Sequence, residues 1–456
     1  MHATTQDQPV TNRSMHQFMK SPRNRRLVLM FMVATLFFMG ALLVQPWNNA
    51  QPQASETLPR SERFGEAFTL DESIAQMQQR IALNDKDHDA YAQLGLLLLQ
   101  RVRSGGDAAD YERADQALNA ALARESNQVD ALVGKGILAL GLHDFRDALV
   151  WAEKAQAINP FRPDILGIMT DAHVELGDYD AAVTTLQAMM DLRPGLNSYS
   201  RTAYVRELHG DVDGAIAAMQ TAAEIGWPGD EPTLWTTVQL GNLHFNRGDL
   251  ATAEATYQAA LTQSPDYIYA LAGMAQVWAA QGRVEDAIAT YRQLLTRVPV
   301  PGFAIALGEL LEATGDLAGA QEQYELVELM QMLNEAAGMN VDLEMALFTS
   351  DHHADKATAL AQAEAAYAAR QTVYTADVMA WALYHSGQSQ EAQPYMDEAM
   401  RLGTQDARLF YHAGMIALAQ GDQEVARQFL TRALAINPHF SPLYAAAVTD
   451  TLATLE

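Results

Sequence analysis

The feature that most constrains the fold is a helical hairpin of about 34 residues that recurs along most of the chain. Its clearest copy occupies residues 234–267, where Gly248-Asp249 separates two amphipathic helices and Pro265 ends the second. Residues that must be small stand where the helices approach closely, with an aromatic residue on the same face: Gly241, Ala253, Tyr257 and Ala260. Because one hairpin buries its apolar face only against its neighbours, the pattern predicts a stacked array.

The same unit can be followed about ten times through residues 88–440. The copies begin near residues 88, 129, 163, 196, 234, 268, 301, 340, 373 and 407. The first copy carries seven extra residues around 101–110, which predicts a longer turn, and the eighth copy is degenerate. The flanking segments 68–87 and 441–456 have helical patterns, so we expect an N-terminal and a C-terminal capping helix.

This pattern resembles the tetratricopeptide repeat (TPR) superfamily over residues 88–455. The resemblance implies an all-α fold, a right-handed superhelical solenoid of TPR helix-turn-helix repeats, whose concave groove binds peptides or protein segments. The whole chain is similar to bacterial-type membrane-anchored TPR proteins, in which a single transmembrane helix precedes the array.

The first 67 residues differ in composition from the array. Residues 27–44 form a run of eighteen uncharged, mainly apolar residues, which at about 1.5 Å per residue is long enough to span a bilayer. Residues 1–26 form a basic tail, expected to be disordered and cytoplasmic by the positive-inside rule, and residues 45–67 form a flexible linker. We therefore expect an uncleaved anchor and an array on the outer (periplasmic or extracytoplasmic) side. The alternative is a cleaved signal, which would release a secreted or periplasmic adaptor.

The chain carries a formal net charge of −26 and contains no cysteine. The basic tail has five basic residues against Asp7, a net charge of +4, so the remainder carries −30. An acidic body repels phosphates, which argues against nucleic acid as a partner. The lack of cysteine excludes disulfides and thiolate sites, and the sequence has neither a phosphate-binding glycine loop nor a G-x-S-x-G motif. These features predict a protein that is not an enzyme and holds no cofactor.

One cluster has the composition of a metal site. The segment Asp351–Asp355, with His352 and His353, is the densest group of potential ligands. Adjacent histidines diverge on a helix, however, and no third ligand follows at a recognisable spacing. We predict no metal site, and keep a metal-binding protein or an enzyme that uses this turn as the alternative from another functional class.

A second acidic segment imitates the start of a calcium loop, with carboxylates at Asp85, Asp87 and Asp89. Ala90 and Leu96 stand where such a loop needs glycine and glutamate. We therefore interpret the segment as a solvated turn that caps the first repeat helix.

The resemblance implies which side chains face the groove, because positions 2, 5, 9 and 12 of each first helix line it in this superfamily. These positions give nine candidate partner-binding residues: Asp171, Tyr204, Asn242, Tyr269, Gln276, Tyr374, Trp381, Tyr384 and Tyr411. The four aromatic residues of the C-terminal repeats form a candidate patch for an apolar or extended peptide. The alternative is that Trp381 and Tyr384 pack between helices.

The groove positions are also acidic. They include Asp171, Glu175, Glu207, Glu309 and Glu312, and the body of the chain has only four lysines. Some members of the superfamily hold a partner's terminal carboxylate with lysine, arginine and asparagine, and this chain departs from that pattern. We therefore expect a neutral or basic protein or peptide segment as the partner of a membrane-anchored, non-catalytic scaffold, which contacts the lipid bilayer through its N-terminal helix.

Overall fold

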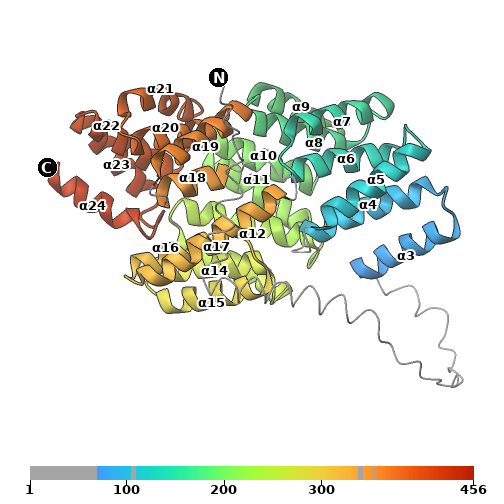
Figure 1. The fold of residues 1–456 in the computed structure, drawn as a ribbon, viewed down its shortest axis with the longest axis horizontal. Coiled ribbons are helices and arrows are strands. Elements are labelled where there is room, and N and C mark those ends of the chain that lie inside the picture. The colour runs from blue at the N-terminus through green and yellow to red at the C-terminus, as the bar shows by residue number, and fades with distance from the viewer. Residues whose placement is uncertain (1–68, 104–108, 337–342, 353–354, 456) are drawn as a thin grey trace, which may run out of the picture. The chain divides into compact units, whose positions relative to one another are not determined.

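A computed structural model describes residues 69–103, 109–336, 343–352 and 355–455 (Figure 1). The described helices all belong to one compact unit, residues 68–456. The predicted tail, anchor and linker lie outside the described residues. In the described ranges the chain forms 22 α-helices and no strand, and none of these helices is long and apolar enough to cross a membrane.

The helices form ten hairpins, which stack in chain order (Figure 1). The first helices of the hairpins are α4 (His88–Arg103), α6 (Val129–Gly141), α8 (Pro163–Leu176), α10 (Leu196–Leu208), α12 (Glu231–Asn246), α14 (Ile268–Ala280), α16 (Pro301–Ala313), α18 (Leu343–His352), α20 (Val373–His385) and α22 (Ala407–Ala419). The second helices are α5 (Ala109–Arg124), α7 (Phe145–Ile158), α9 (Tyr179–Leu192), α11 (Val212–Ile225), α13 (Leu250–Gln263), α15 (Val284–Arg297), α17 (Leu317–Ala336), α19 (Lys356–Ala369), α21 (Ser389–Ala399) and α23 (Gln423–Ile436). Two further helices flank the described array, α3 (Leu70–Leu83) and α24 (Tyr444–Thr454).

The turn inside each hairpin follows from local chemistry. In the fifth hairpin Gly248 adopts a φ of 82°, a left-handed conformation that glycine tolerates without strain. The next residue, Asp249, accepts a hydrogen bond from the backbone N–H of Thr252 (3.2 Å) and so caps α13. The Gly-Asp pair therefore ends one helix and starts the next.

Close packing between neighbouring hairpins explains the small residues. The ring of Tyr257, fully buried on α13, lies between Gly241 of α12 and Gly273 of α14. A Cβ atom added at either glycine would lie 2.4 or 2.5 Å from that ring, which is closer than carbon atoms pack. One aromatic side chain thus joins two repeats, and the predicted reason for glycine at position 241 is confirmed.

The sequence predicted a longer turn over residues 101–110 of the first repeat. The inserted residues instead partly extend the two helices of this hairpin, so the turn between them is shorter than predicted. Helix α4 continues to Arg103 and α5 begins at Ala109. The fully buried Asp110 accepts hydrogen bonds from Arg101 (2.7 and 2.8 Å), and Arg101 also contacts Asp71 of α3 (3.0 Å). This network holds the N-terminal flanking helix to the first hairpin.

The late repeats return to the early ones. The ends of repeats 8, 9 and 10 contact the hairpin turns of repeats 3, 4 and 5, respectively, across 192 to 196 residues of sequence. Val373 N–H donates to the Tyr179 hydroxyl (3.0 Å), Thr404 Oγ1 donates to the Leu208 carbonyl, and Asn437 Nδ2 donates to the Phe245 carbonyl (3.0 Å). We call this three-step contact the seam.

Apolar packing and charge support the seam. Val373 packs with Val174, Tyr179 and Leu208 in one buried cluster. The guanidinium of Arg370 forms an ion pair with Glu175. Because the seam joins segments that are distant in sequence, it closes part of the array around an interior space.

Candidate functional site

The space enclosed by the seam is a cavity of about 770 Å³, and a second cavity of about 440 Å³ adjoins it. Six residues line both, among them Phe245, Gln276 and Arg408. The first helices of the early and middle repeats form one wall of the larger cavity. The first helices α18 and α20 and the ends of repeats 8 to 10 form the other. A volume of this size suits a peptide segment or a small molecule.

The larger cavity is acidic. Among the described residues, six carboxylates and two guanidinium groups line it: Asp171, Glu175, Glu207, Glu344, Asp377 and Asp406, with Arg370 and Arg408. Some of this charge is compensated, since Glu175 pairs with Arg370 and Asp171 pairs with Arg201 (2.6 Å). The surplus of carboxylates favours a cationic group inside the cavity.

Glu207 has the most unusual carboxylate of the cavity. Burial, and secondarily the nearby charge of Asp406, raises the pKa of Glu207 to about 7, against a smaller opposing effect of its hydrogen bond with Asn246. A carboxyl group that titrates near neutral pH lacks a cationic partner inside the free protein. A bound cation would therefore stabilise the charged form of Glu207 more than that of the other carboxyl groups in the cavity.

Arg408 stands at the junction of the two cavities. Burial acts to lower its pKa, but the neighbouring carboxylates outweigh burial and keep the pKa raised: Glu309, Asp351, Asp406 and Asp377. A permanently charged guanidinium at this point divides the acidic interior.

Three of the nine predicted groove residues line the larger cavity, namely Asp171, Gln276 and Tyr374. Tyr204 of α10 is 37% exposed and does not line either cavity. The structure brings the three cavity residues together from α8, α14 and α20. Partner binding by them stays a prediction.

Two predicted residues serve the packing of the middle repeats. Asn242 accepts a hydrogen bond from the Tyr257 hydroxyl (2.7 Å). Tyr269 packs edge-on against Tyr267 and Phe303, with ring centroids 5.6 and 6.3 Å apart. Both side chains are partly buried, and neither lines either cavity.

The aromatic patch expected in the C-terminal repeats is largely a core. Trp381 is 1% exposed, and its indole N–H donates to Asp351 of α18 (2.8 Å). Tyr384 stacks on Trp381 with centroids 4.8 Å apart, and buried Tyr411 stacks on Tyr444 of α24. The alternative in which Trp381 packs between helices therefore describes its position. The physical reason is that α18 and α24 cover this face.

The sequence missed Arg370, Asp406 and Arg408. Arg370 and Asp406 lie in the connections that follow the second helices of repeats 8 and 9, outside the groove positions. Arg408 stands at position 2 of the first helix of repeat 10, which is a groove position. The seam carries these connections back to the early repeats, which places their side chains in the cavity. The local signals are the groove position of Arg408 and the charged residues on either side of Ala407, where α22 begins.

The side chains of Asp351–Asp355, the segment considered as a metal or catalytic turn, do not point toward one common site. The Asp351 carboxylate accepts hydrogen bonds from Trp381 and Tyr444, while His352 stacks on Tyr324 and lies 3.4 Å from Glu309. Asp355 caps α19, and His353 lies outside the described residues. Within the described ranges, no group of three or more histidine, aspartate and glutamate side chains is arranged to hold a metal ion.

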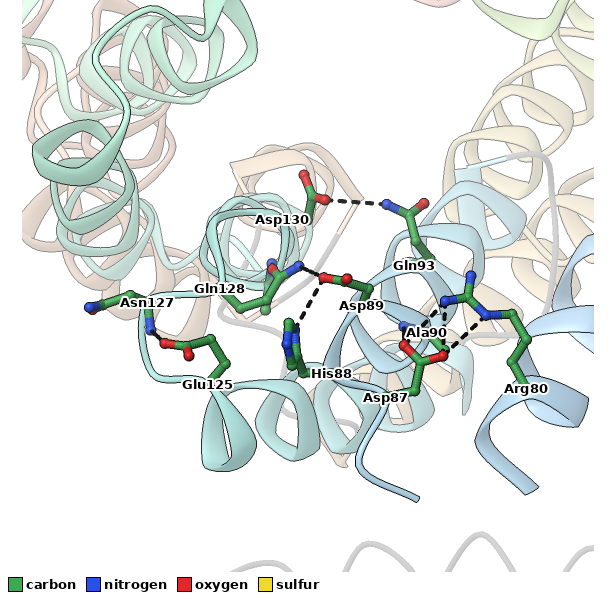
Figure 2. A network of polar contacts seen from close by, with 11 residues as sticks. Arg80, Asp87, His88, Asp89, Ala90, Gln93, Glu125, Asn127, Gln128 and Asp130 are labelled. Carbon is green, nitrogen blue, oxygen red and sulfur yellow. Dashed lines mark hydrogen bonds and ion pairs between the residues drawn. The ribbon is translucent and has the colours of Figure 1, made fainter. Parts of the chain in front are cut away.

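The segment that imitates a calcium loop is a helix cap, as predicted. Figure 2 shows that Asp87 accepts a hydrogen bond from the backbone N–H of Ala90 (3.0 Å) and forms an ion pair with Arg80 (2.9 Å). The Asp89 carboxylate points instead toward Gln128 (3.0 Å) (Figure 2). The two carboxylates thus bind separate partners.

Stacked helical hairpins around an interior cavity define a helical-repeat solenoid, a class that binds protein segments on its repeats. A model of the tetratricopeptide repeat family matches residues 170–231, 238–302, 273–329 and 378–439. The repeats of this chain belong to the tetratricopeptide repeat superfamily, and the predicted resemblance is confirmed.

Two relatives each align with about half of this chain. Cellulose synthase 1 operon protein C of Komagataeibacter xylinus is 28% identical over 244 residues, which is 52% of this chain and 15% of that protein. Anaphase-promoting complex subunit 7 of Arabidopsis thaliana is 22% identical over 236 residues, 51% of this chain and 41% of that protein. The chain therefore covers only a minor part of each relative.

Among solved structures, a thermophilic TPR protein of Thermus thermophilus is 19% identical and has a TM-score of 0.36. The match covers 40% of this chain and 98% of that protein.

Proposed function

We propose that the protein is a membrane-anchored, non-catalytic scaffold that holds a basic segment of a protein partner in the larger cavity. The observation that carries the proposal is the acidic lining of a space that the chain's own seam encloses. An extended peptide that presents lysine or arginine side chains would replace water around these carboxylates and form charge-assisted hydrogen bonds.

The chemistry of the cavity supports binding and not turnover. Two of its carboxylates already have partners, Glu175 in Arg370 and Glu207 in Asn246. The buried His412 faces Asp377 (2.9 Å) and stacks on Trp381, with ring centroids 4.0 Å apart. An imidazole enclosed in this way packs the helices and is not presented to a substrate.

The anchor and the placement of the array rest on sequence. Residues 27–44 are uncharged and long enough for a bilayer, and Arg25 and Arg26 precede them. We propose that this segment is retained and that the array lies on the outer side of the membrane. N-terminal sequencing of membrane-extracted protein tests the retention, and a mature start near Ser55 would favour the secreted adaptor.

Binding is tested by titrating fluorescent peptides of equal length, one rich in lysine and one rich in glutamate, into the full chain in mild detergent. We expect the lysine peptide to bind more tightly at pH 8. Substituting Glu207→Gln and Asp406→Asn together should weaken its binding about tenfold, because charge-assisted hydrogen bonds contribute about 1.5–3 kcal/mol.

Asp213→Asn is the matched control, since Asp213 is almost fully exposed and does not line either cavity. It removes the same charge as Asp406→Asn and should leave affinity within about twofold, because long-range surface charge is screened by salt. Equal binding of the two peptides, or equal losses in the cavity variant and the control, would contradict the proposal.

A further inference from the structure

The chain contains the same four-residue motif, Ala-Ile-Asn-Pro, at the ends of the second helices of repeats 2 and 10. The copies occupy residues 157–160 and 435–438. Repeats of one superfamily share positions, so each motif lies at the same edge of its hairpin. One copy is docked on another part of the chain and the other is not.

The docked copy forms the last step of the seam. Ile436 is 8% exposed, and Asn437 donates from Nδ2 to the Phe245 carbonyl. The Ile436 carbonyl lies 3.2 Å from the point where a Cβ atom would stand on Gly248. The motif therefore fits against the glycine turn of a TPR hairpin.

The copy at residues 157–160, which is not docked on another part of the chain, has a similar backbone conformation. Asn159 has φ and ψ of −138° and 90°, against −150° and 106° for Asn437. Each asparagine accepts a hydrogen bond at Oδ1 from the backbone N–H two residues later, at Phe161 (3.2 Å) and His439 (2.8 Å). Ile158, however, is 44% exposed, and no described residue accepts a hydrogen bond from Asn159 Nδ2.

Exposed apolar residues continue from the free motif along the same edge. Leu192 and Ile225 follow Ile158 at intervals of 34 and 33 residues, which places them at the same position of repeats 3 and 4, and both are exposed. Phe161 and Trp227 in the adjoining turns are more exposed still. We call these five residues the early edge. In repeat 10 the seam covers the corresponding residue, Ile436.

The opposite edge of the late repeats is open. A Cβ atom on Gly177 or Gly210 in the seam would lie 2.1 or 2.3 Å from a carbonyl oxygen of the late repeats. At Gly315, Gly387 and Gly421, which have the same left-handed φ, nothing among the described residues lies within 4 Å. Leu317 follows Gly315-Asp316 as Tyr179 follows Gly177-Asp178, and it is exposed.

We propose that the early edge binds the open hairpin turns of repeats 7, 9 and 10 in a second copy of this chain. The seam is the basis for this partner, because in it the same motif already docks on a turn of the same kind. The contact joins different surfaces of the two copies, so it is a head-to-tail contact that continues the seam from one molecule into the next. It does not depend on what the cavity binds.

Sedimentation velocity of the full chain in mild detergent tests the proposal. We expect the mass of the particle to rise with protein concentration and to exceed a dimer. Ile158→Asp in the early edge, or Leu317→Asp in the open turns, should raise the dissociation constant at least about tenfold, as truncated anchors commonly do. Circular dichroism checks that both variants keep their helix content.

Val150→Asp is the matched control for Ile158→Asp. Val150 lies on the same helix and is 43% exposed, but it stands two turns before the early edge and is not part of the motif. It should leave association unchanged. A wild-type chain that stays monomeric, or equal losses for Ile158→Asp and Val150→Asp, would overturn the proposal.

Mixing the two edge variants separates head-to-tail association from other modes. A copy with Ile158→Asp keeps its open turns, and a copy with Leu317→Asp keeps its early edge, so an equal mixture can form one intact contact. We expect the mixture to form heterodimers and no larger species. If the mixture stays monomeric although each variant is folded, the two surfaces do not bind each other and the proposal is wrong.

Discussion

Position nine of the first helix has opposite environments in two parts of the array. Asp171 of α8 and Gln276 of α14 occupy it in the third and sixth repeats and line the cavity. Trp381 of α20 occupies it in the ninth repeat and is buried against α18. The repeat position therefore fixes the face on which a side chain lies. Contacts from distant segments decide whether that face is open or covered.

The largest expected effect is the difference in stability between a substitution at Trp381 and one at Gln276. Trp381→Ala should lower the free energy of unfolding by about 3–5 kcal/mol, because it leaves a cavity in a packed core. Gln276→Ala, at the same repeat position, should change it by less than about 0.5 kcal/mol. Thermal melts followed by circular dichroism measure the difference.

Hydrogen exchange shows where the loss of stability occurs. Since each repeat is coupled chiefly to its neighbours, Trp381→Ala should increase exchange first in α20 to α23. If Trp381→Ala left the melting temperature unchanged and weakened peptide binding, Trp381 would be a groove residue and the comparison would fail.

A glycine pair tests the seam. Gly210 and Gly387 occupy the same turn position in repeats 4 and 9, with φ of 76° and 74°. Alanine at either position carries the same left-handed strain, but only at Gly210 does the new Cβ meet a backbone carbonyl. Gly210→Ala should therefore cost about 1–3 kcal/mol more than Gly387→Ala, as overpacking does. Denaturant unfolding gives both values, and equal costs would mean that the seam is open in solution.

The carboxylate of Glu207 has a smaller, pH-dependent effect. Burial, with the charge of Asp406, raises its pKa from 4.5 to about 7. A raised pKa favours the protonated folded state, so this contribution to stability is present below about pH 4.5 and is lost as the pH rises through 7. Glu207→Gln should therefore be more stable than the wild type at pH 8, by about 1–3 kcal/mol, and similar to it at pH 4. Melts at the two pH values check this, and equal stability at pH 8 would contradict it.

The smallest expected effect is on binding. Because Glu207 carries its full charge only above neutral pH, the lysine-rich peptide should bind several-fold more tightly at pH 8 than at pH 6. The Glu207→Gln variant should lose this pH dependence. Anisotropy titrations at constant ionic strength measure it, and a pH dependence that persists in the variant would assign the effect to another group.

The local part of the fold could be predicted from the sequence. The ring of Tyr257 between two glycines, the Gly248-Asp249 turn and the Asp87 cap all follow from the sizes and hydrogen-bonding groups of residues within one or two repeats. These contacts span few residues, so the spacing of small, aromatic and capping residues is enough to predict them.

The seam could not be predicted in this way. It depends on small rotations between successive repeats that accumulate over about five hairpins, and on single polar side chains such as Thr404 and Asn437. For the same reason, repeat positions placed Asp171 and Gln276 correctly on the inner face, but they missed Arg370 and did not reveal that α24 covers Tyr411.

Closure of the array by the seam is the central claim, because the cavity and the early edge both depend on it. The chain has no cysteine, so cysteines placed at Glu175 and Arg370 are the only thiols of the variant. These residues are 195 apart in sequence and form an ion pair in the seam. The measurement is the rate of intramolecular crosslinking by a short bismaleimide, with single-cysteine variants as controls for contacts between molecules. The seam predicts fast crosslinking in the folded chain and much slower crosslinking in denaturant, where closing so long a loop is entropically costly. Equal rates in the two conditions would show that the late repeats do not return to the early ones.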